Sequence, residues 1–316
     1  MKKTILGIDI GKKMLYFSDV NGKVRGEAVN DGRGFRKIKR IITENHIELV
    51  VLEASGGYEQ FILIELAKEG FPVTIVDPTR VRNHAKAAGK LAKTDIIDAK
   101  IIAHFGLCHQ PRPFVLGSEN QNKLRSLGKR RRQLIKSRTQ EKCRRDRCLD
   151  EISEASIERM ISILKEEVER IDSLMEALIQ QDVELQQKSR ILESCPAVGK
   201  ISTAVLLAEC PELGSLNRKE IASLAGLAPM NRDSGSYQGK RFIQKGRKYL
   251  RNALYMVVLS GQIHNPYIRS IFERLREKGK PAKVALVACM RKILTQLNAM
   301  IRDGKPWDLE VAKGIS

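Results

Sequence analysis

Apolar runs that alternate with helical patterns fill the first 110 residues of this 316-residue chain, and they restrict the fold more than any other feature. Runs with the length and composition of strands cover 4–10, 14–20, 23–30, 47–52 and 72–76. Helical patterns cover 34–45, 58–69, 80–88 and 95–107. The turn signal Asn21-Gly22 joins two of the strands as a hairpin. Strands that alternate with helices predict an α/β layer domain.

Four acidic residues occupy special places in this pattern. Asp9 and Glu53 lie at the carboxyl ends of predicted strands, where open α/β sheets place their ligand sites. Asp95 and Asp98 follow Thr94, a predicted N-cap, and positions i and i+3 share one face of a helix. At 4 Å and a surface-like dielectric, two such charges repel by about 4 kcal/mol.

A positive charge is therefore expected near these carboxylates. One interpretation is a solvated helix start whose acids complement the helix dipole. The other is a D-E-D-D metal site formed by Asp9, Glu53, Asp95 and Asp98. Hard oxygen ligands suit Mg²⁺ or Mn²⁺, and two ions about 4 Å apart can promote phosphoryl transfer.

The net charge of +20 indicates a polyanionic partner, most simply nucleic acid. No apolar run of 18 residues and no signal peptide is recognised, so we expect a cytoplasmic protein without a membrane partner. The six cysteines lack CxxC spacing and the five histidines are dispersed. They predict reduced thiols and no zinc site.

Two segments concentrate the positive charge. Residues 123–147 hold twelve Lys and Arg and two acidic residues, and 240–251 hold six basic residues and no acid. A solvated helix face explains a few such charges, but contact with a nucleic-acid backbone explains runs of them. The predicted contact residues are Lys129, Arg130, Arg131, Arg132, Arg144, Arg145, Lys240, Arg241, Lys245 and Arg247.

Three parts are predicted along the chain. The first is 1–110, which ends before Pro111-Arg112-Pro113. The second, 111–190, contains apolar residues that repeat with 4-3 spacing from Ile157 to Leu178, which predicts a coiled-coil contact between protomers or an intramolecular helical hairpin. The third, 191–316, is mostly helical. Its Pro196–Gly199 turn predicts a helix-hairpin-helix element that can bind a phosphate, or an ordinary corner between helices.

Several motifs resemble those of a known family. They are Gly7-Ile8-Asp9-Ile10-Gly11-Lys12, Leu52-Glu53-Ala54-Ser55-Gly56-Gly57-Tyr58, Lys93-Thr94-Asp95-Ile96-Ile97-Asp98-Ala99, Cys195-Pro196-Ala197-Val198-Gly199, Leu224-Ala225-Gly226-Leu227-Ala228-Pro229 and Asp233-Ser234-Gly235-Ser236. Together they are similar to the motifs of DEDD insertion-sequence transposases of the IS one-ten family. The resemblance covers nearly the whole chain. It departs at Ala197, where Gly is usual, and at Ser55, where Thr is common.

The resemblance implies a RuvC-like N-terminal domain with an RNase-H-like fold, a helical and coiled-coil middle segment, and a C-terminal transposase domain. It implies a recombinase that moves its own element, with Ser234 as the nucleophile that links covalently to DNA. It also implies a non-coding bridge RNA as guide, and a dimer or tetramer whose site combines residues of different protomers.

Other functions fit parts of the pattern. A nuclease would use the same acids with water as nucleophile. An actin-like ATPase or sugar kinase would use Gly7–Gly11 as a phosphate loop, but no second phosphate loop follows and the net charge fits poorly. A DNA-binding architectural protein would need no metal. Ser234 itself is also typical of a turn in a Gly/Ser loop.

Overall fold

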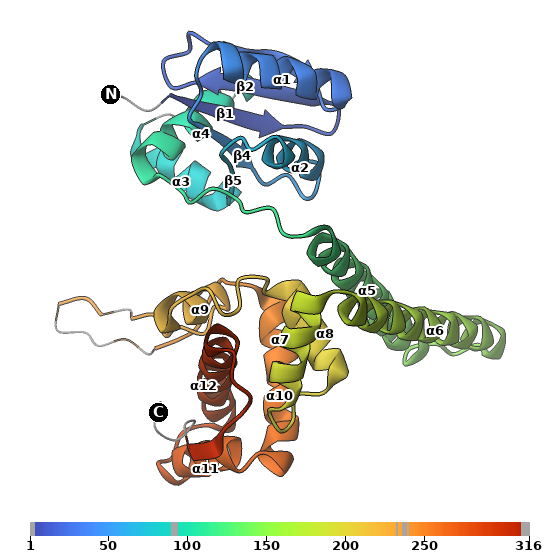
Figure 1. The fold of residues 1–316 in the computed structure, drawn as a ribbon. Helices are drawn as coiled ribbons and strands as arrows, with labels where there is room; N and C mark the ends of the chain where they lie inside the picture. Colours follow the sequence, from blue (N-terminus) through green and yellow to red (C-terminus); the bar gives the residue numbers. More distant parts are fainter. Residues whose placement is uncertain (1–3, 90–93, 232, 236–238, 240, 311–316) are drawn as a thin grey trace. The chain divides into compact units, whose positions relative to one another are not determined.

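The computed structural model describes residues 4–89, 94–231, 233–235, 239 and 241–310. The chain divides into two compact units, Met1–Leu116 and Gly117–Ser316. The sheet and four helices belong to the first unit and the remaining helices to the second (Figure 1). The division into 1–110, 111–190 and 191–316 stays a prediction.

The first unit is built on a five-stranded mixed sheet. Its strands are β1 (Ile5–Ile10), β2 (Met14–Asp19), β3 (Arg25–Val29), β4 (Leu49–Glu53) and β5 (Val73–Val76). Their order is β3-β2-β1-β4-β5, with β1 to β3 antiparallel and β1, β4 and β5 parallel. This mixed sheet is consistent with the RNase-H-like domain that the sequence predicts.

Helices cover both faces of this sheet. One face packs on α1 (Gly32–Glu44) and α2 (Gln60–Lys68), and the other on α3 (Pro78–Ala87) and α4 (Asp95–His109). Because successive side chains of a strand point to opposite faces, Ile8 contributes to the first core, while Ile5 contributes to the second. Both cores are apolar, which explains the continuous apolar strands.

The second unit is helical. Its helices are α5 (Glu119–Arg145), α6 (Glu151–Gln181), α7 (Val183–Glu193), α8 (Lys200–Glu209), α9 (Arg218–Leu224), α10 (Lys248–His264), α11 (Pro266–Glu277) and α12 (Ala282–Asp303). One apolar core runs through them, with Trp307 packed against it. Among helices of the described ranges, only α12 is long and apolar enough to cross a membrane, and 61% of its most apolar stretch is buried inside this unit. Its composition is that of a core helix.

The 4-3 repeat lies on α6, which packs against α5 as an intramolecular hairpin. Val168, Ile171 and Met175 of the repeat are buried in the core of this unit, while Ile157 and Ile161 are half-buried. Within one chain, α5 is therefore the helix that packs against the apolar repeat of α6. A contact between protomers stays a prediction.

Candidate functional site

Three of the four predicted acids converge in the first unit. Asp9, Asp95 and Asp98 each bring one carboxylate oxygen into a group of three whose members lie within 4.8 Å of one another. Asp9 comes from β1, and the two others come from the first turn of α4. Three hard oxygen donors at this spacing fit a divalent cation such as Mg²⁺.

Glu53 ends β4, the parallel neighbour of β1. The register pairs Ile8 with Leu52, so Asp9 and Glu53 follow at corresponding places on the two strands. Strand alternation puts both on the α4 face of the sheet. Glu53 is nevertheless not a member of the close group of three. Its role as a metal ligand stays a prediction.

Two features of the sequence bring the start of α4 onto β1. Thr94 caps the helix, with its hydroxyl accepting a hydrogen bond from the backbone N–H of Ile97 (3.3 Å), as predicted. Gly7 leaves the space that α4 occupies, because a Cβ there would lie 2.2 Å from the carbonyl oxygen of Ala99 and 2.4 Å from the nitrogen of Ala103. The absent side chain thus lets the helix approach β1 beside Asp9.

Glu59 is a site residue that the sequence analysis missed. Its Oε2 accepts hydrogen bonds from the backbone N–H groups of Ser55 (3.0 Å) and Gly57 (2.9 Å), and from the Ser55 hydroxyl (2.9 Å). Burial by itself raises the pKa of Glu59, but hydrogen bonds from its own backbone N–H, from the backbone of Ser55 and Gly57 and from the Gln60 side chain outweigh it and bring the pKa to about 2. Glu59 thereby fixes the turn that begins just after Glu53. The signal in the sequence is a carboxylate that follows a Gly-Gly turn.

Ser234 is exposed and lies in the loop that follows α9. The backbone N–H of Met230 donates to the carbonyl oxygen of Phe242 (2.9 Å) at the base of this loop. The Arg241 guanidinium contacts the carboxylate of Asp233 (3.3 Å), the residue before Ser234. Gly235, the residue after it, has φ +54, in the left-handed region that favours glycine. Ser236 lies outside the described residues.

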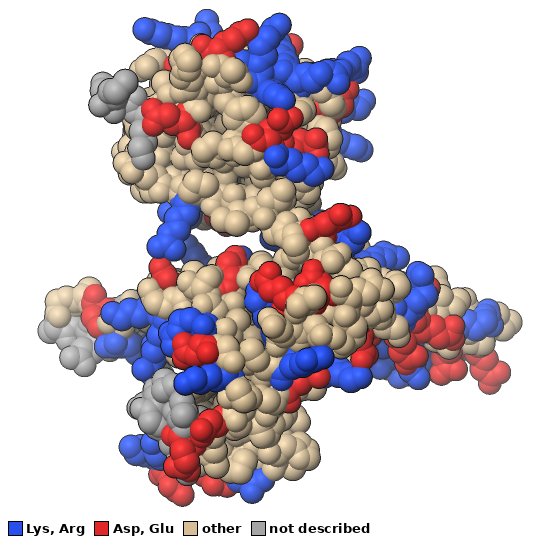
Figure 2. All heavy atoms as spheres, in the orientation of Figure 1, with Lys and Arg blue, Asp and Glu red and all other residues tan. Residues whose placement is uncertain are grey.

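The basic residues of α5 fall into two groups. Arg131 pairs with Asp172 of α6, and Arg132 pairs with Glu209 of α8, so both hold helices together. Lys129 and Arg130 are exposed. Near the end of α5, Arg144 pairs with Glu141 of the same helix, and Arg145 lies 3.4 Å from Asp146. Figure 2 shows side chains of both charges along the α5–α6 hairpin. Nucleic-acid contact stays a prediction for all six residues.

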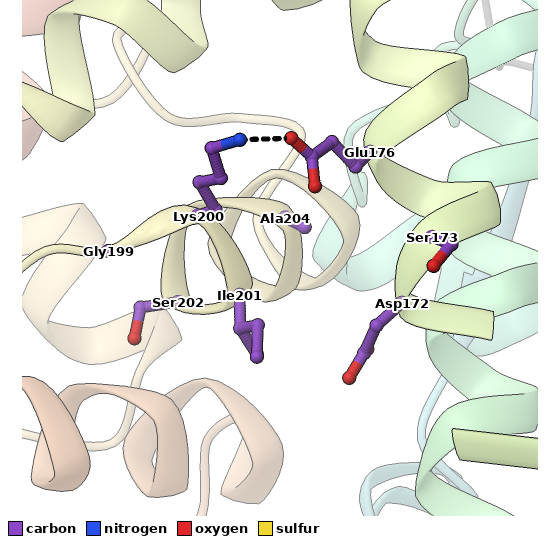
Figure 3. A pocket seen from close by; sticks show the side chains of 8 residues that line it. All are labelled: Asp172, Ser173, Glu176, Gly199, Lys200, Ile201, Ser202 and Ala204. Carbon is purple, nitrogen blue, oxygen red and sulfur yellow. Dashed lines mark hydrogen bonds and ion pairs between the residues drawn. The ribbon is translucent and has the colours of Figure 1, made fainter. Parts of the chain in front are cut away.

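The Pro196–Gly199 turn leads into α8, whose N-cap Gly199 has no side-chain capping bond. Figure 3 shows the pocket of about 480 Å³ beside this helix start, with Asp172 and Glu176 of α6 facing it. Lys200 pairs with Glu176, which raises the pKa of the lysine. Asp172 pairs with Arg131 and Glu176 pairs with Lys200, so phosphate binding at this helix start stays a prediction.

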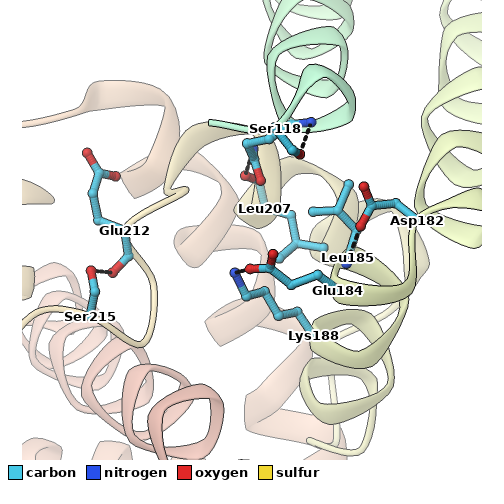
Figure 4. Close-up of polar contacts among 9 residues, drawn as sticks. Ser118, Asp182, Glu184, Leu185, Lys188, Leu207, Glu212 and Ser215 are labelled. Atoms are coloured by element: carbon cyan, nitrogen blue, oxygen red, sulfur yellow. Dashed lines mark hydrogen bonds and ion pairs between the residues drawn. The ribbon is translucent and has the colours of Figure 1, made fainter. Parts of the chain in front are cut away.

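The second basic segment, 240–251, includes Phe242 at the base of the Ser234 loop and continues into α10. Arg247 binds both carboxylate oxygens of Glu212 (2.6 Å each) and the carbonyl oxygen of Glu209 (2.9 Å). The Glu212 carbonyl accepts from the Ser215 hydroxyl (2.7 Å; Figure 4). Arg247 therefore supports the fold. Lys245 is exposed, and Lys240 lies outside the described residues.

A pocket of about 550 Å³ lies next to the loop base, where Phe242 lines it. Its basic lining residues are Arg218, Arg241, Lys283, Arg291 and Lys292. Its other lining residues are Leu227, Pro229, Phe242, Ile243, Val284, Val287, Ala288 and Thr295, so no acid is among the described residues that line it. Burial lowers the pKa of Lys292, and the charges of Arg274 and Arg218 lower it further. This crowding of like charges would be relieved by an anion.

Comparisons with known proteins show which families this chain resembles. Residues 6–154 match the transposase family DEDD_Tnp_IS110, and residues 189–273 match the family "Transposase IS116/IS110/IS902 family". The pilin gene-inverting protein of Moraxella bovis is 30% identical over 98% of this chain and 99% of its own length. The uncharacterized 43.6 kDa protein of insertion element IS110 from Streptomyces coelicolor is 32% identical over 45% of this chain and 35% of its own.

Proposed function

Because this chain belongs to the IS110 family of DEDD transposases, which act on DNA and depend on divalent metal, we propose that it cuts and rejoins DNA with Ser234 as nucleophile. The observation that carries the proposal is the convergence of Asp9, Asp95 and Asp98. Excision and insertion of a mobile element would be the outcome. The alternative is a nuclease that uses water in place of Ser234.

The acidic group supplies the metal-binding part of the site. We assign Asp9, Asp95 and Asp98 as ligands, with Glu53 as the fourth, because all four offer hard oxygen donors. Two Mg²⁺ or Mn²⁺ ions bound there would offset the negative charge that builds on the scissile phosphate. Gly7 and Thr94 position α4, and Glu59 positions the turn after Glu53.

Ser234 supplies the covalent part. Its Oγ would form a bond to phosphorus while the bond from phosphorus to the leaving nucleoside oxygen breaks. The hydroxyl of Ser234 loses its proton, and the leaving oxygen gains one. Its exposure on the loop is compatible with attack on a bound strand. Arg241 holds the neighbouring Asp233 and thereby fixes the backbone beside the nucleophile.

The basic pocket at the base of the Ser234 loop would hold part of the DNA strand. Arg218, Arg291 and Lys292 would bind phosphates, and the apolar floor around Phe242 and Val287 would contact sugar or base. The exposed Lys129 and Arg130 extend the basic surface along α5. These contacts would be mainly to the DNA backbone, so another component would have to recognise the DNA sequence.

A guide RNA could supply that choice. The family resemblance implies a non-coding bridge RNA that pairs with target and donor DNA, which leaves the protein to recognise backbone and shape. The Moraxella bovis relative is named for inverting a pilin gene. Inversion, excision and insertion differ in the arrangement of the DNA sites and share the same cutting and joining. We place this activity in the cytoplasm of a prokaryotic cell, in a homo-oligomer.

A trapping experiment tests the proposal. The purified protein is incubated with Mg²⁺, labelled junction DNA and RNA transcribed from the DNA that flanks the gene, and adducts are resolved on denaturing gels. We expect a protein–DNA adduct that is lost in Ser234→Ala and in Asp9→Asn but kept in the matched control Ser236→Ala. Cleavage by Ser234→Ala at the normal rate without an adduct would establish the nuclease and overturn the recombinase.

A further inference from the structure

A second group of metal-binding side chains lies between α3 and α4. His84 of α3 and His104 of α4 face each other, with Nε2 and Nδ1 2.8 Å apart. Cys108 follows His104 by one helical turn, and its Sγ lies 3.8 Å from the same Nδ1. These three donors all lie within 4.8 Å of one another. None of them belongs to the acidic group or to the Ser234 loop.

The spacing is close to that of a tetrahedral zinc site. With the usual zinc–ligand bond lengths, two nitrogen ligands lie about 3.3 Å apart, and nitrogen and sulfur lie about 3.6 Å apart. The observed separations are 2.8 Å and 3.8 Å. These two separations therefore differ from the ideal values by about 0.5 Å and 0.2 Å. A hard cation such as Mg²⁺ prefers the oxygen donors at Asp9, whereas imidazole and thiolate suit zinc.

We propose that His84, His104 and Cys108 bind one Zn²⁺ ion that joins α3 to α4. His104 and Cys108 stand at i and i+4 on one helix, so the helix presents both ligands together. His84 comes from the other helix, so the ion links two elements. His109, whose ring centroid lies 5.2 Å from that of His84, is the nearest further imidazole for the fourth position.

Accessibility separates Cys108 from the core cysteines. Burial raises the pKa of Cys195 to about 12 and that of Cys289 to about 11, so these thiols stay protonated. Cys108 is exposed, and His84 and His104 are half-buried. An ion can therefore reach the three ligands from solvent. The partial burial of the two histidines would slow dissociation of the ion.

The two sites share α4 but lie at opposite ends of it. Asp95 and Cys108 are thirteen residues apart, which is about 20 Å along the helix. Zinc at the far end would hold α4 against α3 and so support the position of Asp95 and Asp98. The inference does not depend on Ser234 or on recombination.

Cobalt titration tests the site on the full chain. Co²⁺ is added in the presence of excess Mg²⁺, which occupies the acidic group, and absorption is recorded. We expect one equivalent of Co²⁺ to give the thiolate charge-transfer band and the visible bands of a tetrahedral site, and one Zn²⁺ to abolish them. Cys108→Ser should lose the charge-transfer band, and His104→Gln should weaken binding at least tenfold.

Cys143→Ser is the matched control, since Cys143 is also exposed but lies on α5. It should keep both bands, and one equivalent of Zn²⁺ should raise the melting temperature of this variant as it does for the wild type but not for Cys108→Ser. Far-UV circular dichroism establishes that each variant is folded. A wild-type protein without a charge-transfer band, or a band that survives in Cys108→Ser, would overturn the proposal.

Discussion

Individual side chains around the acidic group act through backbone geometry as much as through charge. Asp9, Asp95 and Asp98 could be chosen from the sequence, because strand ends and helix starts are visible in the apolar pattern. Glu59 follows a Gly-Gly turn that the sequence shows, but its role depends on backbone N–H groups that turn toward it only in the folded chain. His84 likewise comes close to His104 only because α3 packs against α4. The i, i+4 spacing of His104 and Cys108, by contrast, can be read from the sequence.

Glu59 gives a prediction at this scale. Its folded pKa of about 2 lies below the ordinary 4.5, so its stabilisation is complete above pH 4.5 and is lost as the pH falls toward 2. Glu59→Gln should cost about 2 kcal/mol at pH 7, since hydrogen bonds to a charged acceptor are lost. Hydrogen exchange of the β4 and α2 amides at pH 7 and pH 3 measures this. The difference between variant and wild type should shrink at pH 3.

The matched control is Glu65→Gln on the same helix. Glu65 forms a surface ion pair with Lys68, and such pairs contribute less than about 1 kcal/mol. It should leave exchange of the same amides nearly unchanged at both pH values. Equal losses in the two variants would contradict the assigned role of Glu59.

At the scale of helices and strands, the positions of α4 and α5 decide what the charged residues can do. The sequence predicted α4 from apolar positions at the helical period, and the family resemblance implied the helical middle segment that contains α5. It could not divide the α5 arginines into those that pair with α6 or α8 and those that face solvent, since this depends on which face packs. The 4-3 repeat of α6 similarly predicted a partner helix without saying that it would be α5.

Gly7 permits the contact between β1 and α4. Gly7→Ala should push α4 from the sheet, because the new Cβ would lie 2.2 Å from a backbone oxygen. We expect a loss of about 3 kcal/mol in the free energy of unfolding, typical of overpacking, and a higher Mg²⁺ concentration for half-maximal cleavage. Denaturation and Mg²⁺ titration measure the two effects. Gly32→Ala, where a Cβ would meet nothing within 4 Å, should change neither; equal effects of both variants would refute this.

Neighbouring residues of α5 should separate binding from stability. Lys129→Gln with Arg130→Gln should weaken nucleic-acid binding and reduce the salt slope of log K by about 2, because two phosphate contacts are lost. Arg131→Gln should instead cost about 2 kcal/mol of stability, because it leaves Asp172 without its partner in a mostly buried place. Salt-dependent binding and thermal melting distinguish the two. A salt slope unchanged in the double variant would remove α5 from the proposed binding surface.

For the whole molecule, the group of three aspartates that is proposed to bind metal lies in the first unit, and the proposed nucleophile Ser234 lies in the second. The sequence predicted the acids from two strand ends and a helix start, and the family resemblance pointed to Ser234. The sequence could not say whether the acidic group and Ser234 of one site belong to one protomer or to two. Neither charge nor periodicity contains this information. The family resemblance favours two protomers.

Mixing two inactive variants tests this assignment. Ser234→Ala and Asp9→Asn are each expected to form no adduct, but together they should recover about a quarter of the wild-type yield if dimers mix at random and sites are shared between protomers. Adducts are counted on denaturing gels after the variants are exchanged at low concentration. No recovery from demonstrated mixed dimers would place both parts of the site in one protomer.

The two ligand groups on α4 affect how a common assay is interpreted. A chelator such as EDTA would extract a cation from Asp95 and Asp98 and also zinc from His104 and Cys108. Inactivation by EDTA therefore cannot identify which ion the chemistry requires. Addition of Mg²⁺ alone restores only the oxygen site. A preparation that has lost both ions and receives only Mg²⁺ could then be inactive because it lacks zinc.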